Sequence, residues 1–211
     1  MSQKWNLLIP LVLCLATESP ATAQETTDLP FYLPTPQGWR TETIPLPLDF
    51  APELEYEGLE ELRFSPGMFA EIEVDFWSYA FIWWVPEETH FDAERLRLDL
   101  ESYFRGLMTA VAKAREFDPG EPEYVVELEA VESSSSDHAQ WQGTVSTYDA
   151  FTTRKPIKLG VRIEIVPCPS QGHVAAFFQL SPQPIHHRIW EVMAEMRSGF
   201  RCARHDSASG S

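Results

Sequence analysis

The stretch from Asp75 to Val85 (DFWSYAFIWWV) constrains the fold of this chain more than any other segment. Side chains alternate between the two faces of a β-strand, and here both alternating sets are mainly apolar. One set is Phe76, Ser78, Ala80, Ile82 and Trp84, and the other is Trp77, Tyr79, Phe81, Trp83 and Val85. Because such a strand needs cover on both faces, we predict that it lies inside a sheet with packed layers on each side. The alternative is an exposed aromatic face that binds a carbohydrate or a lipid.

Two segments carry apolar residues at helical spacing. Between Phe91 and Arg115 the stripe consists of Leu96, Leu100, Tyr103, Phe104, Leu107 and Val111. Asp92 is the expected N-cap of this helix, and the sequence Asp118-Pro119-Gly120 follows its end. A second helix is predicted from Pro184 to Phe200, with Ser181 before Pro182 as its candidate start.

The remaining apolar segments have the length and composition of strands. The predicted strands are Trp39 to Ile44, Leu59 to Phe64, the aromatic run, Glu123 to Glu132, Gln140 to Phe151, Ile157 to Val166 and His173 to Leu180. Short turns link consecutive strands, which favours antiparallel pairing. We therefore predict an α+β domain with a meander-rich antiparallel sheet of about seven strands and two main helices packed on it, layered α/β/α.

The first residues have the three-part pattern of a secretory signal peptide. Lys4 is followed by the apolar run Leu7 to Ala16, which is too short to span a bilayer, and then by Ala21-Thr22-Ala23. We predict cleavage after Ala23, and the alternative is a lipoprotein that is acylated at Cys14. The predicted organisation is a cleavable signal peptide (1–23), a polar lead-in (24–30), one α+β domain (31–202) and a disordered tail (203–211).

The chain is strongly acidic, with 32 Asp and Glu against 16 Lys and Arg and a formal net charge of −16. This charge argues against nucleic acid and anionic membrane surfaces as partners, since both require clustered basic residues. The acid is concentrated between Glu42 and Asp75, where ten carboxylates accompany the single base Arg63. We expect a solvated face there, and the alternative is a surface for a cation or a basic partner.

The cysteine count favours one disulfide bond. Of the three cysteines, Cys14 lies in the leader and two remain in the predicted mature chain. Because exported proteins meet an oxidising environment, we expect Cys168 and Cys202 to be paired. The alternative is that Cys168 is a thiol nucleophile with His173 nearby.

No motif of a known chemistry is present, so the remaining candidates are isolated side chains. His186 and His187 are adjacent, so their side chains diverge on a helix and we expect them to face water; the alternative is a zinc site built from His173 with one of them. Ser133 to Ser136 reads as a polar turn and lies in no Gly-x-Ser-x-Gly motif. The sequence predicts no cofactor and no metal.

One further candidate is an acid/base set at a sheet edge, formed by Asp149, Arg154 and Glu164.

The order of elements also resembles the Mog1/PsbP-like α/β/α sandwich. The resemblance rests on the opening FYLPTPQGW (31–39), the long middle helix, the meander and the closing helix that ends in MRSGF (196–200). That superfamily includes photosystem accessory proteins and a nuclear-transport factor, so the resemblance implies a binding or accessory role.

We therefore predict an exported protein of the periplasm or the extracellular space, with no integral membrane span. Its expected role is to bind a protein or small-molecule partner without catalysis. The alternative function is a secreted hydrolase whose acids and histidines come from separate loops.

Overall fold

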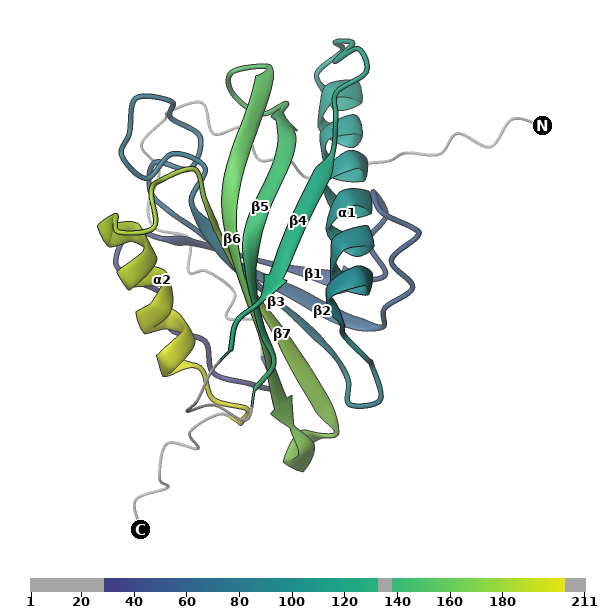
Figure 1. Cartoon of the computed structure of the whole chain (residues 1–211), viewed down its shortest axis with the longest axis vertical. Coiled ribbons are helices and arrows are strands. Elements are labelled where there is room, and N and C mark those ends of the chain that lie inside the picture. The colour runs from purple at the N-terminus through teal and green to yellow at the C-terminus, as the bar shows by residue number, and fades with distance from the viewer. Residues whose placement is uncertain (1–28, 133–137, 204–211) are drawn as a thin grey trace, which may run out of the picture.

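All seven strands in the described part of the chain belong to one antiparallel sheet, in the order β1-β2-β3-β7-β6-β5-β4. The computed structural model describes residues 29–132 and 138–203. The elements are β1 (Arg40–Leu46), β2 (Gly58–Phe64), β3 (Tyr79–Pro86), α1 (Ala93–Ala114), β4 (Val125–Ala130), β5 (Gln140–Asp149), β6 (Lys155–Cys168), the short 3₁₀ helix η1 (Pro169–Gln171), β7 (His173–Ser181) and α2 (Arg188–Gly199). Figure 1 shows α1 and α2 on opposite sides of the sheet. The predicted α+β class, with seven strands and two helices, is confirmed.

The sheet consists of two meanders joined side by side. Strands β1 to β3 pair in sequence order, and so do β4 to β7. Strand β3 then pairs with β7, which places Phe81 opposite Phe178. Helix α1 carries the chain from β3 in the first meander to the far edge of the second. The antiparallel pairing expected from the short links is therefore present. The two meanders are joined by the pairing of β3 with β7, which are far apart in the sequence.

Strand β3 is buried on both faces, as predicted. Phe81 and Trp83 face α1 and Ile82 faces α2, and all three are 0% exposed. The rings of Phe81 and Phe178 stack with centroids 4.4 Å apart. The strand begins at Tyr79 rather than at Asp75, because residues 75–78 form turns and Trp77 has a φ of 51°. The alternative of an exposed aromatic face is wrong.

Helix α1 matches its prediction closely. The Asp92 side chain accepts a hydrogen bond from the Arg95 amide at 2.8 Å, which satisfies one free donor of the first turn. Leu96, Leu100 and Phe104 are fully buried against the sheet. The helix is 22 residues long and covers the face that carries the larger core.

Helix α2 begins four residues later than predicted. His187 is its N-cap, and its Nδ1 accepts from the Ile189 amide at 3.2 Å. The preceding segment is a turn closed by a bond from the His187 amide to the Pro184 carbonyl at 2.8 Å. Trp190 and Met193 are buried in a second, smaller core, which the segment containing Phe31 also covers.

Two acids in the stretch from Glu42 to Asp75 are buried, which corrects the expectation of a solvated face. Glu60 is 0% exposed and receives a hydrogen bond from the Trp83 indole at 3.2 Å. Glu61 is 2% exposed and forms an ion pair with Arg63 and a hydrogen bond with Thr43. Strand β2 lies between two strands and beneath cover on both sides, so its polar residues must find partners inside the protein.

The predicted signal peptide (1–23), most of the lead-in and the tail from residue 204 lie outside the described residues. Among the helices that the structure describes, none is both long and apolar enough to cross a bilayer.

Candidate functional site

A groove of about 600 Å³ lies beside the first turns of α2. Its opposite wall is the loop of residues 65–78, which connects β2 to β3. Trp39, which immediately precedes β1, also lines it. From α2 the groove receives Arg188, Ile189 and Val192, and from the loop it receives Val74 and the carboxylates of Glu73 and Asp75. The site is therefore an apolar cleft with acidic groups along one wall.

The loop of residues 65–78 is held in place by a chain of turns. Ser65 Oγ donates to the Asp75 carbonyl at 2.7 Å, and the Trp77 amide donates to the Met68 carbonyl at 3.1 Å. The Gly67 amide donates to Asp75 Oδ2 at 3.1 Å. A Cβ at Gly67 would meet that carboxylate at 2.1 Å, so only glycine fits here without a shift. The loop therefore presents its side chains from an ordered backbone.

The ordered loop points two aliphatic side chains into solvent. Ile72 is 92% exposed and Val74 is 68% exposed, and the exposed acids Glu71 and Glu73 flank Ile72. Exposed aliphatic residues at the tip of an ordered loop contribute nothing to the core. Such residues beside a groove are typical of interaction sites.

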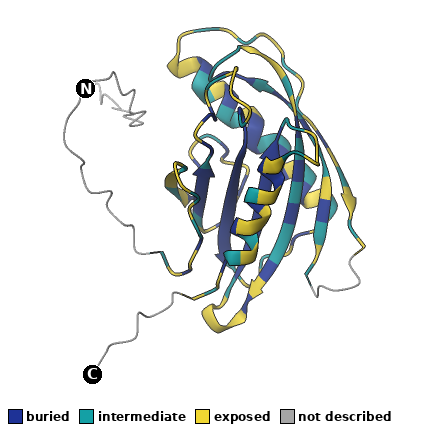
Figure 2. Cartoon of the chain, turned by 90° about the vertical axis from the view of Figure 1, so that its left-hand side faces the viewer, coloured by how far each residue is buried: buried dark blue, intermediate teal, exposed yellow. Residues whose placement is uncertain are grey.

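A second groove of about 540 Å³ lies on the other flank of α2, over β5, β6 and β7. Its charged lining residues are Arg162, Glu164 and Arg197. Figure 2 shows α2 lying across the strands, with exposed residues along its outer side. The short helix thus leaves a groove on each flank.

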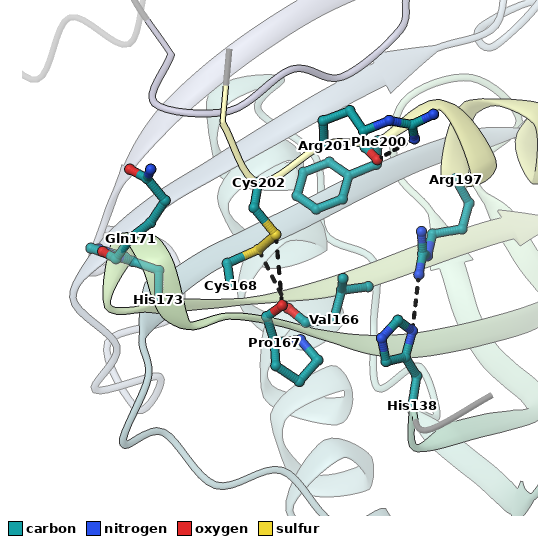
Figure 3. The surroundings of a disulfide bond; sticks show 10 residues. All are labelled: His138, Val166, Pro167, Cys168, Gln171, His173, Arg197, Phe200, Arg201 and Cys202. Atoms are coloured by element: carbon teal, nitrogen blue, oxygen red, sulfur yellow. Dashed lines mark hydrogen bonds between the residues drawn. A yellow bond between two sulfur atoms is a disulfide. The ribbon is translucent and has the colours of Figure 1, made fainter. Parts of the chain in front are cut away.

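His138, Glu164 and Arg197 are in mutual contact at the second groove. Arg197 donates to Glu164 at 2.5 Å, and His138 Nδ1 lies 2.9 Å from the same carboxylate. Figure 3 shows the Arg197 guanidinium beside the His138 ring, at 3.3 Å from Nδ1. Glu164 is therefore neutralised by Arg197. Of the predicted acid/base set, only Glu164 lies here.

The other two members of that set lie at the opposite end of the sheet. Asp149 is opposite Lys155, whereas Glu164 is opposite Gln140, so the two carboxylates are about 30 Å apart along the strands. Asp149 accepts bonds from the amides of residues 151–153, and Arg154 packs over the ring of Phe117 at 4.3 Å. Asp149 stabilises a turn, and the three side chains do not form one site.

The histidines also lie apart. His187 caps α2, whereas His173 stacks on Trp84 with centroids 4.9 Å apart and its Nδ1 lies 2.7 Å from the Gln171 carbonyl. Within residues 29–132 and 138–203, no group of three or more His, Cys, Asp and Glu side chains is arranged to hold a metal ion. Ser133 to Ser136 lie outside the described residues.

The structure joins Cys168 to Cys202 in a disulfide that links the end of β6 to the residues after α2 (Figure 3). The two Cα atoms are 5.4 Å apart, within the range that a bridge requires. Cys168 is fully buried in the smaller core. In this bonded form its sulfur is not available as a nucleophile.

Sequence reasoning missed both grooves. The alternation Glu71-Ile72-Glu73-Val74-Asp75 could have indicated exposed aliphatic side chains. In the sequence, however, it cannot be distinguished from the acidic stretch or from the residues that lead into the aromatic strand. No spacing in the sequence placed α2 beside Arg162 of β6.

Comparisons with known proteins add little. No family model matches this chain, and no curated protein matches it. A crystal structure of LpqN, described as involved in cell envelope biogenesis of Mycobacterium tuberculosis, is 13% identical over 71% of this chain and 68% of its own. The TM-score is 0.28. A similarity at this level carries no argument about function.

Proposed function

We propose that this chain is a non-catalytic binding or accessory protein of the envelope or the secreted space. It docks a protein partner in the groove between the loop of residues 65–78 and α2. The observation that carries the proposal is the ordered loop that exposes Ile72 and Val74 beside that groove.

The free energy gained by burying Ile72 and Val74 favours the docking of a partner at this loop. Removing both aliphatic side chains from water contributes roughly 3–4 kcal/mol, by the usual value for a buried Ile or Val. Because the loop is already fixed by its turns, little conformational entropy is lost on binding. A small groove with ordered apolar contacts therefore supports a specific interaction.

The charge of the surface specifies the partner further. Glu73 and Glu71, which forms an exposed ion pair with Lys155 at 3.7 Å, stand on each side of Ile72, and the chain as a whole carries −16. A complementary partner presents apolar side chains flanked by Lys or Arg, which enter the groove while the basic groups meet the acids. The exported location rests on the signal-peptide pattern and on the cysteine pair. A relationship to the Mog1/PsbP-like sandwich, with its accessory roles, remains part of this proposal.

The experiment begins with site-specific photo-crosslinking of the mature protein in extracts of its native host. A crosslinking residue is placed at position 72 and, in a control protein, at position 98. Leu98 is a matched control because it is an exposed apolar side chain, at 47%, on the remote helix α1. A partner captured at position 72 and not at position 98 is then identified and purified.

Direct titration with the purified partner decides the proposal. The double variant I72S/V74S is expected to weaken the Kd at least tenfold, and L98S to leave it unchanged. Raising the salt concentration should slow association, because rim charges act mainly on the on-rate. Equal capture at both positions, or a Kd that the double variant does not change, would refute this docking site.

A further inference from the structure

The second groove has the opposite charge balance to the rest of the molecule. The chain has twice as many acidic as basic residues, yet the charged residues that line this groove are two arginines, Arg162 and Arg197, and one glutamate, Glu164. Since Glu164 pairs with Arg197, the remaining positive charge is that of Arg162. The groove is therefore a local cationic site on an acidic protein.

Arg162 is exceptional among the arginines of the described residues. Four of these are buried or half-buried: Arg63, Arg97, Arg162 and Arg197. Three of the four form ion pairs with carboxylates. Within residues 29–132 and 138–203, the guanidinium of Arg162 forms neither an ion pair nor a hydrogen bond. The other arginines of these residues that lack an ion pair are all exposed. A partly desolvated guanidinium carries five N–H donors that need acceptors.

The guanidinium of Arg162 is also held in a defined position. Its Cζ lies 5.3 Å from the centre of the Trp190 ring, a cation–π contact that holds the group beside the ring. Trp190 is anchored by a bond from its indole to the Gln183 carbonyl at 3.0 Å, and it lies close over Gly160. A site built on a strand and a packed helix keeps its geometry without a ligand.

The two polar neighbours of Arg162 in the sheet are held by other groups. In the sheet Arg162 lies between Gln142 of β5 and Gln179 of β7. The Gln142 amide donates to Glu129 at 2.8 Å, and the Gln179 amide donates to the Met193 carbonyl at 3.1 Å. Both amides are thus fixed by other groups, and the guanidinium faces a groove of a size suited to a small molecule.

We propose that the groove over β5, β6 and β7 binds a small organic anion, and that Arg162 binds its carboxylate or phosphate group. The planar fork of a guanidinium matches both groups with two parallel hydrogen bonds. The site is separate from the partner groove on the other flank of α2. A test of anion binding at this site is therefore independent of the test of the proposed docking function.

The test is a titration monitored by NMR of the arginine Nε–H resonances. The probes are glycerol 3-phosphate and succinate, with glycerol as the uncharged control. We expect one or both anions to shift the Arg162 resonance saturably and glycerol to leave it unchanged. A response to glycerol 3-phosphate alone assigns a phosphoryl ligand, and a response to succinate alone assigns a carboxylate ligand.

Three variants locate the effect. R162Q should weaken binding roughly tenfold to a hundredfold, the usual effect of losing a charge-assisted pair. R105Q should leave binding unchanged, since Arg105 also lies over an aromatic ring, Tyr124 at 5.7 Å, but is exposed on α1. R162K retains the positive charge but lacks the planar guanidinium fork, and we expect it to bind with intermediate affinity. It also serves as a second variant in case R162Q fails to fold. Unchanged binding in R162Q, or no response to either anion at tens of millimolar, would overturn the proposal.

Discussion

The buried carboxyl of Glu60 should make the stability of this protein fall as the pH rises. Burial raises the pKa of Glu60 from 4.5 to about 8, and hydrogen bonds from Trp83 and Tyr103 offset only part of this effect. Its Oε2 has no hydrogen-bond partner in the described part of the chain. Glu42 from β1 adds a like charge, and Tyr79 from β3 lies nearby. Among the described residues, no basic group lowers the pKa of Glu60.

The direction follows from proton linkage. In the unfolded chain Glu60 ionises near pH 4.5, whereas in the folded protein it stays protonated up to about pH 8. The favourable contribution is therefore complete below pH 4.5 and declines by about 1.4 kcal/mol per pH unit until pH 8. By pH 7 the expected loss is about 3 kcal/mol, a large share of the stability of a single domain.

The substitution Glu60→Gln removes the ionisation and keeps the shape of the side chain. We expect the difference in unfolding free energy, variant minus wild type, to rise by about 3 kcal/mol between pH 4.5 and pH 7 and to level off above pH 8. Urea denaturation, followed by tryptophan fluorescence at each pH, measures it. Glu121→Gln on the surface is the control and should give a constant difference. The same constant difference for Glu60→Gln would refute the reasoning.

Three further predictions follow from the fold and the sequence. Alkylation should find no free thiol in the folded, oxidised protein, and replacing Cys168 and Cys202 by alanine should cost about 3–4 kcal/mol for a separation of 34 residues; two reactive thiols would contradict this. Phe81→Asp should prevent folding, because it places an unpaired charge at a fully buried position, while Leu98→Asp should melt near the wild-type temperature; a well-folded Phe81→Asp protein would contradict the core assignment. Mass spectrometry of the exported protein should give an N-terminus near Gln24, and a lipid-modified leader cysteine would exclude that cleavage site.

The sequence predicted those parts of the fold that depend on regular spacing. The stripe that includes Leu96 and Phe104 defined α1, and two-sided apolar alternation placed Phe81 and Trp83 inside the sheet. Both signals are local, because each follows from the geometry of a single element. The pairing of β3 with β7 is not local, and no spacing within either strand specifies it.

The boundaries and the site were predicted less well, for physical reasons. The turns of residues 65–78 depend on individual hydrogen bonds, such as that from Gly67 to Asp75, which have no periodic signature. Glu61 and Arg63 are two residues apart on one strand, a spacing that places them on one face, so their buried ion pair was within reach of sequence reasoning. The grooves depend on where α2 lies, which the tertiary structure alone determines.

The difference between the two helices explains why the candidate sites lie where they do. Helix α1 has 22 residues, about 33 Å of helix, and covers its face of the sheet along most of its length. Helix α2 has 12 residues, about 18 Å, and packs over β3 and β7 at the middle of a seven-stranded sheet. Each flank of α2 is therefore left with sheet or loop surface that it does not reach. The first groove combines aliphatic side chains with the acids of the loop and with Arg188, whereas the second contains the unpaired guanidinium of Arg162. The ligands proposed for the two grooves therefore differ in chemistry. Variants of Ile72 and Val74 should consequently leave anion binding intact, and R162Q should leave partner binding intact.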